Sequence, residues 1–209
     1  MSSIPARRRV RKTPDARREE IAAAAVAIAR EQGLLGVTLR AVAARADVAP
    51  GLVAHYAPSM DDLVATAFSS LVSAELADVD AFVRAEPDPL RRVAMLIDTL
   101  LDGSRDDVTL VWVQAWALGP RSDALAAAVR TEMDAWQSFI GALVAAGADA
   151  GVFRVTDAAA VAWQMLAIID GLNAHALVHW HAAPERHELT KRSVAALLGL
   201  PADAFAPAS

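Results

Sequence analysis

Apolar residues recur at helical spacing along most of the chain, and helix start and stop signals divide this pattern into segments. The first predicted helix opens at Thr13-Pro14-Asp15, where a capping threonine is followed by a proline and an acid. It ends at Gly33, a residue type that commonly terminates helices. We expect Ile21, Ala25 and Ile28 to share its inward face, because they recur every three or four residues.

Eight further helices follow from the same signals. Ser59 with Asp62 three residues later resembles a capping box, and the helix that it opens carries an apolar stripe through Leu63, Ala67, Leu71 and Ala74. The predicted segments are 38–46, 50–56, 59–84, 88–102, 106–118, 122–147, 156–181 and 184–199. No repeat of fixed period connects them, and residues 202–209 are predicted to form a flexible tail.

Composition agrees with an all-α fold. The 209 residues are 55% hydrophobic and contain no cysteine, which excludes disulfides and Cys-ligated zinc and fits a cytoplasmic protein. The N-terminus lacks the apolar segment of a signal peptide. Residues 158–180 are long enough to cross a bilayer, but they include Gln164 and Asp170, so we expect a helix buried in protein instead of a membrane span.

Charge is distributed unevenly. Residues 1–58 carry ten Lys/Arg and five acidic residues, whereas residues 59–209 carry ten Lys/Arg and twenty acidic residues. A positive segment joined to a negative one indicates that the positive part meets a polyanion such as DNA. A solvated basic segment without a partner is the alternative.

The segment 50–56 is unusual because it is a helix of about two turns between two prolines, too short to be stable alone. Together with the helix before it, it has the spacing of a helix-turn-helix, in which the second helix enters the major groove of DNA. Pro50 and Gly51 are small enough for a close approach. Leu52, His55 and Tyr56 are predicted to face DNA.

The stretch TLRAVAARADVAPGLVAHYAPSMDDL, residues 38–63, resembles the signature of the TetR family of bacterial transcriptional regulators. Its LVAHY segment is similar to the BetI-like subgroup, which is typified by a choline-responsive repressor. The resemblance implies nine helices arranged as a three-helix DNA-binding head (residues 1–58) and a helical ligand-binding and dimerisation body (residues 59–201). It also implies a homodimer formed by the last two helices, at about 156–181 and 184–199.

Roles in DNA binding are carried over from this resemblance. The head residues expected to contact bases or phosphates are Thr38, Arg40, Pro50, Gly51, Leu52, His55 and Tyr56. The arginines of the N-terminal arm could enter the minor groove, and those assigned here are Arg8, Arg9 and Arg11.

The head departs from the family pattern at three positions. Asp47 stands where a turn glycine is usual, although aspartate tolerates a left-handed backbone better than most residues. Ala57 replaces a common phenylalanine, and Met60 replaces a lysine that often touches phosphate. These departures motivate an alternative function, a helical small-molecule-binding protein whose DNA-binding head has degenerated.

The body contains all five tryptophans, which could line a cavity for an apolar or cationic effector. Ordinary core packing is the alternative for each of them. Gln114 and Asp170 lie in apolar helices and need either a ligand or an interhelical hydrogen bond. The candidate ligand-binding residues are Trp112, Gln114, Trp116, Trp136, Phe139, Trp163 and Asp170.

The remaining chemistry is sparse. His175 and His179 have a spacing that could hold a metal, but nearby acids or cysteines that would complete the ligand set are lacking, so neither a metal nor a cofactor is expected. No nucleophile elbow, P-loop, dinucleotide fingerprint or zinc-protease motif occurs, and an enzyme is therefore the least favoured hypothesis. The sequence favours a dimeric repressor that a small-molecule effector releases from a palindromic operator.

Overall fold

The structure is a computed structural model that describes residues 13–206. This part of the chain is all-helical, with nine α-helices and two short 3-10 helices, as predicted. Their bounds are α1 (Pro14–Gln32), η1 (Leu34–Gly36), α2 (Leu39–Arg45), α3 (Pro50–Tyr56), α4 (Met60–Arg84), α5 (Pro89–Leu101), α6 (Asp106–Leu118), η2 (Gly119–Arg121), α7 (Asp123–Asp149), α8 (Ala158–Ala176) and α9 (Ala183–Leu197). No helix within this range is long and apolar enough to cross a membrane.

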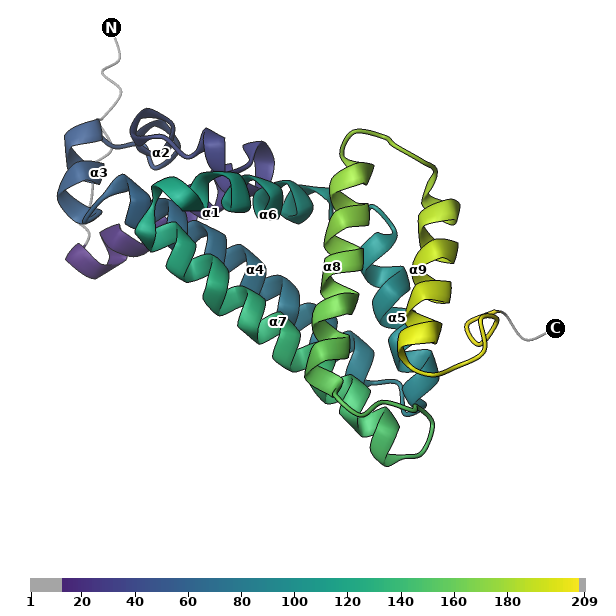
Figure 1. The fold of residues 1–209 in the computed structure, drawn as a ribbon. Coiled ribbons are helices and arrows are strands. Elements are labelled where there is room, and N and C mark those ends of the chain that lie inside the picture. The colour runs from purple at the N-terminus through teal and green to yellow at the C-terminus, as the bar shows by residue number, and fades with distance from the viewer. Residues whose placement is uncertain (1–12, 207–209) are drawn as a thin grey trace, which may run out of the picture.

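The long helices α4 and α7 lie side by side and form the axis of the molecule (Figure 1). At one end of this axis, α1, α2 and α3 pack together. At the other end α8 and α9 stand next to α5. Helix α6 lies between the two ends and contacts α1 and η1 on one side and α7 and α8 on the other. It therefore contacts both the head and the body.

The predicted helix starts are confirmed by their caps. The Thr13 hydroxyl accepts a hydrogen bond from the Ala16 N–H at 3.3 Å, and Thr38 and Ser59 cap α2 and α4 in the same way. Each cap satisfies one of the backbone donors that a helix start leaves unpaired.

Three predicted helix ends are corrected by the structure. Helix α8 ends at Ala176 instead of 181, because His179 and His181 have φ values of 57° and 60°, a left-handed backbone that cannot continue a helix. Helix α9 covers 183–197, close to the predicted 184–199. Helix α7 continues past Gly147 to Asp149, and the chain turns at Gly151, where φ is 72°.

The inward face of α4 also differs from the prediction at one position. Leu63, Ala67 and Leu71 are buried as expected, but Ala74 is exposed. The next inward position is Glu75, which is 8% exposed. A carboxylate therefore occupies a core position where the apolar pattern predicted alanine.

Gly147 and Gly141 on α7 offer a matched pair for testing the packing of the body. A Cβ atom at Gly147 would lie 2.0 Å from the ring of Phe153, which is buried, so Gly147→Ala should destabilise the protein by about 1–3 kcal/mol through overpacking. A Cβ at Gly141 meets nothing closer than 3.8 Å, so Gly141→Ala should stabilise α7 by roughly 0.5–1 kcal/mol. Chemical denaturation of the two variants measures both effects, and equal destabilisation would contradict this packing.

Candidate functional site

The first candidate site is the surface of the head around α3. Helices α2 and α3 are joined by a turn in which Asp47 has a φ of 51°, so aspartate takes the left-handed conformation usual for glycine. Val53 on α3 is fully buried and holds the helix against the head. Arg45 at the end of α2 donates to the Glu31 carboxylate of α1 at 2.9 Å, which fixes the pair to the first helix.

The expected DNA-contacting residues form one accessible surface. Pro50, Gly51 and His55 are exposed, and Leu52 and Tyr56 are partly exposed. No atom lies within 4 Å of the Cβ position at Gly51, so the start of α3 is open to an incoming backbone or base.

Other elements complete the edge of this surface. Thr38 and Arg40 are exposed at the start of α2. The Arg18 guanidinium of α1 lies 5.9 Å from the centre of the Tyr56 ring and adds a positive charge. Arg8, Arg9 and Arg11 lie outside the described residues.

The three unusual head residues are accommodated. Ala57 and Met60 are both partly buried and pack against the hydrophobic core, while Asp47 forms the turn. The head is therefore a well-packed helix-turn-helix despite the missing phenylalanine and lysine.

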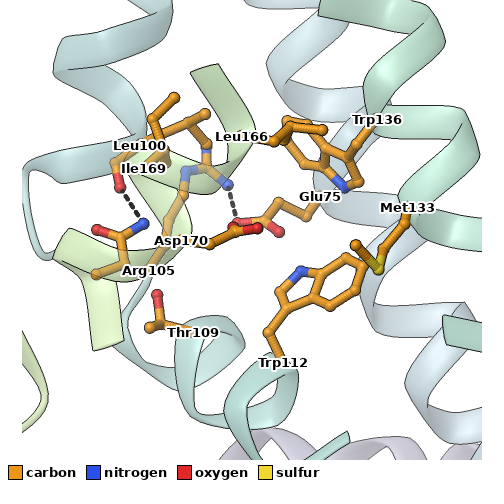
Figure 2. Close-up of a pocket in the computed structure, with 11 residues that line it drawn as sticks. Glu75, Leu100, Arg105, Thr109, Trp112, Met133, Trp136, Leu166, Ile169 and Asp170 are labelled. Atoms are coloured by element: carbon orange, nitrogen blue, oxygen red, sulfur yellow. Dashed lines mark hydrogen bonds and ion pairs between the residues drawn. The ribbon is translucent and has the colours of Figure 1, made fainter. Parts of the chain in front are cut away.

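The second candidate site is a pocket in the body that five helical regions enclose (Figure 2). Its cavity volume is about 50 Å³, measured as the space open to the centre of a water-sized sphere. One water needs roughly 10–15 Å³ on this measure, so the cavity has room for a small ligand group. The lining residues are Glu75 (α4), Leu100 (α5), Arg105 (start of α6), Thr109 and Trp112 (α6), Met133 and Trp136 (α7), and Leu166, Ile169, Asp170 and Asn173 (α8).

Two tryptophans supply the aromatic wall of this pocket. Trp112 packs edge-to-face on Phe68, with ring centres 5.0 Å apart, and Trp136 packs in the same way on Phe139 at 6.0 Å. These contacts hold the indole rings in place. The Trp136 indole N–H is buried and has no hydrogen-bond partner in the described chain, so it remains able to donate to a ligand.

Two carboxyl groups face the same pocket. Burial raises the pKa of Glu75 to about 7, even though the nearby Arg105 guanidinium favours the charged form. Burial likewise raises the pKa of Asp170 to about 7. Arg105 Nη1 lies 3.7 Å from Glu75 Oε1, and Asn173 donates from Nδ2 to the Leu100 carbonyl at 3.0 Å. An aromatic cage with acidic groups is suited to a small organic cation.

The structure divides the sequence-derived ligand candidates into two groups. Trp112, Trp136 and Asp170 line the pocket. Trp116 stacks beside Trp112 at 5.5 Å, and Phe139 supports Trp136, so both lie behind the wall.

The other two candidates lie elsewhere. The side chain of Trp163 is 65% exposed and does not line this pocket. Gln114 contacts the head, where its Oε1 accepts a hydrogen bond from the Leu35 N–H at 3.1 Å.

Sequence reasoning missed the polar residues that accompany the tryptophans. Glu75 carries a recognisable signal, since it lies four residues after Leu71 and four before Val79, both buried. Asn173 lies one helical turn after Asp170. Arg105 gives no such signal, because it belongs to the turn before α6.

The histidines at the end of α8 and after it have other neighbours. His181 Nδ1 lies 2.9 Å from the Glu185 carboxylate, and the His175 ring packs against Trp180. Within residues 13–206 there is no group of three or more side chains placed to hold a metal ion.

Comparison with known proteins places both sites in a family. Residues 21–67 match the model of the tetR family of bacterial regulatory proteins, and residues 89–199 match that of the BetI-type transcriptional repressor C-terminal domain. The HTH-type transcriptional regulator BetI of Rhizobium meliloti is 29% identical over 109 residues, which are 51% of this chain and 54% of that protein. The chain thus spans about half the length of the curated relative that it matches.

Solved structures share the whole architecture. A transcriptional regulator from Rhodococcus sp. Rha1 is 26% identical with a TM-score of 0.72, covering 87% of this chain and 96% of its own. A regulator from Saccharomonospora viridis, solved in complex with choline, is 22% identical with a TM-score of 0.73, covering 84% and 94%. The second similarity concerns the fold alone. The family models, which together cover the head and the body, show that the chain belongs to the TetR family of transcriptional regulators and to its BetI-type subgroup.

Proposed function

We propose that this protein is a dimeric repressor that leaves a palindromic operator when a small organic cation binds in the body. The pocket carries this proposal, because two rigidly held tryptophans, the buried carboxyl group of Glu75 and the half-buried one of Asp170 converge on one cavity. A quaternary ammonium group is attracted to aromatic faces and needs no hydrogen-bond donors or acceptors. The choline complex of the S. viridis regulator supports this class of effector.

The accessible surface of α3 supports operator binding. It presents Gly51, His55 and Tyr56 together. Residues 1–58, which include the head, carry ten Lys/Arg and five acidic residues. An α-helix in this position fits the major groove of DNA. Such a protein acts where DNA is found, so we place it in the cytoplasm.

Exposed apolar side chains on α8, on the segment that follows it and on α9 support dimerisation through the C-terminal helices. Trp163, Trp180 and Leu189 are 65%, 56% and 46% exposed, which is unusual for large apolar side chains. Covering these side chains with a second copy would place two heads on two half-sites, about one helical turn or more apart.

Helix α6 is suited to connect effector and operator. Trp112 and Thr109 on α6 line the pocket. Gln114, half a turn beyond Trp112, accepts a hydrogen bond from the Leu35 N–H of the head at 3.1 Å. Asp107, at the start of α6, lies 3.7 Å from Arg30 of α1. A ligand that displaces the Trp112 ring would therefore shift the contacts that α6 makes with the head. The effector acts only through its different affinity for the two arrangements.

Gln114→Met tests this connection, because it keeps the side-chain length and removes the hydrogen-bond acceptor. We expect the affinity for the effector to remain unchanged. The factor by which the effector lowers operator affinity should fall roughly fivefold, because one hydrogen bond contributes about 1 kcal/mol. Gln137→Met is the matched control, since Gln137 on α7 donates to the Ala159 carbonyl, away from the head. Full coupling in Gln114→Met would show that another contact transmits the signal.

Operator binding itself is tested by fluorescence anisotropy with duplexes that tile the protein's own upstream region. Tight binding to one tile that resists random competitor DNA, and that weakens as salt is raised, supports the repressor. Weak and equal binding to all tiles, together with no sequence recovered by selection from random duplexes, would favour the alternative of a ligand-binding protein with a degenerate head.

A further inference from the structure

Asp170 is the acidic residue of the pocket that is not ion-paired to Arg105. Arg105 lies against Glu75, with Nη1 and Oε1 3.7 Å apart, and Figure 2 shows that the Asp170 carboxyl lies next to this ion pair. Among the described residues Asp170 makes no hydrogen bond and no ion pair. The pocket around it is lined by Leu166, Ile169 and the two indole rings, and by the polar side chains of Glu75, Arg105, Thr109 and Asn173. The Asp170 side chain is half-buried, so a carboxylate there loses part of its hydration and gains no hydrogen bond from the described residues.

The charged groups around the two acids do not supply the missing cation. Burial has the largest effect on the pKa of Glu75. After burial, Arg105 and Arg30 lower this pKa, whereas Asp107 and Asp170 raise it. For Asp170 burial alone raises the pKa, to about 7.

The neighbouring helices add acids instead of bases. On α7, Glu132 lies one turn before Trp136 and accepts a hydrogen bond from Ser73 at 3.1 Å. At the end of α5, Asp102 adds a further negative charge near Arg105. With the two guanidiniums of Arg105 and Arg30 among these five carboxyl groups, the empty pocket favours a neutral Asp170.

We propose that Asp170 is a proton-exchange site, so that a cationic effector enters the pocket as the Asp170 carboxylic acid loses its proton to solvent. This inference rests on the proposed function and adds its regulation. The O–H bond of the acid breaks, the proton leaves to water or buffer, and the positive charge of the ligand replaces it. The net charge of the occupied pocket therefore stays the same as that of the empty protonated pocket. Protons and effector compete for the site.

The competition sets the direction of the pH effect. Below the pKa of Asp170 a bound cation has to displace a proton, so its affinity falls as the pH falls. For one proton and a pKa of about 7, the apparent affinity should drop roughly tenfold between about pH 8 and pH 6. In acidic conditions the repressor would consequently stay on its operator at effector concentrations that release it at higher pH.

Isothermal titration calorimetry of the intact protein with choline chloride tests the exchange. Titrations at about pH 6 in phosphate and in ACES, two buffers with different heats of ionisation, give the number of protons released, which we expect to be close to one. The uncharged analogue 3,3-dimethylbutan-1-ol has the shape of choline without its charge, and it should release none. In Asp170→Asn, choline should bind more weakly, and its proton release and the change in its affinity between the two pH values should both fall to what Glu75 alone contributes.

The outcomes separate this inference from the function on which it rests. If neither choline nor tetramethylammonium binds at either pH, the proposed cationic effector is wrong. If choline binds with the same affinity at both pH values and releases no proton, the function stands and the exchange is overturned. Undiminished proton release in Asp170→Asn would also overturn the assignment to Asp170.

Discussion

The Asp170→Asn substitution is expected to raise the melting temperature of the free protein more at about pH 8 than at about pH 5. The difference between the two effects should be roughly 6 °C or more. The reason is the half-buried carboxyl of Asp170, which makes no hydrogen bond or ion pair among the described residues and whose pKa desolvation raises to about 7. When the pKa of a group is higher in the folded than in the unfolded state, the group stabilises the folded protein in full at pH values below its unfolded-state pKa. That contribution is lost as the pH rises through the folded pKa.

The size of the effect follows from the same shift. Between about pH 5 and pH 8 the parent protein should lose up to about 3 kcal/mol from this one group, whereas asparagine does not ionise. Asp78→Asn on the exposed face of α4 is the control, and it should leave the pH profile of melting unchanged. Parallel melting profiles for the parent and Asp170→Asn would mean that the carboxyl is paired or hydrated in solution.

Tyr56→Phe is expected to weaken operator binding by about 100-fold or more without changing thermal stability. The Tyr56 ring is partly buried and packs against the core, so phenylalanine preserves the fold of the head. We expect the phenolic O–H to donate to a phosphate. A hydrogen bond to a charged partner contributes about 1.5–3 kcal/mol, and a homodimer loses one in each head.

Anisotropy titrations at two salt concentrations identify the contact that is lost. A phosphate contact should weaken specific and random duplexes alike, because phosphates carry no sequence information. A selective loss on the operator would indicate a base contact instead. Unchanged affinity for both duplexes would remove Tyr56 from the DNA-binding surface.

The helices and the head could be predicted from the sequence because their signals are local. Thr13, Thr38 and Ser59 cap the helices that the pattern placed after them, and Asp47 takes the left-handed turn expected from its side chain. The end of α8 was misplaced because apolar residues continue beyond it, and periodicity does not detect the left-handed backbone at His179.

The pocket could be predicted only in part because it forms between helices far apart in the sequence. Trp112, Trp136 and Asp170 stood out individually as bulky or polar residues in apolar helices. Whether Trp163 pointed inward depended on how α8 packs, and it proved to be exposed. The pairing of Glu75 on α4 with Arg105 before α6 is a tertiary contact, which no spacing along the chain encodes.

The most direct test of the account is the affinity of the intact protein for its operator, measured by anisotropy with and without choline at about pH 8. We predict that choline lowers operator affinity by roughly 5- to 150-fold, the usual range of coupling between two sites, while 3,3-dimethylbutan-1-ol has a much smaller effect. Operator affinity that is identical with and without saturating choline would contradict the account.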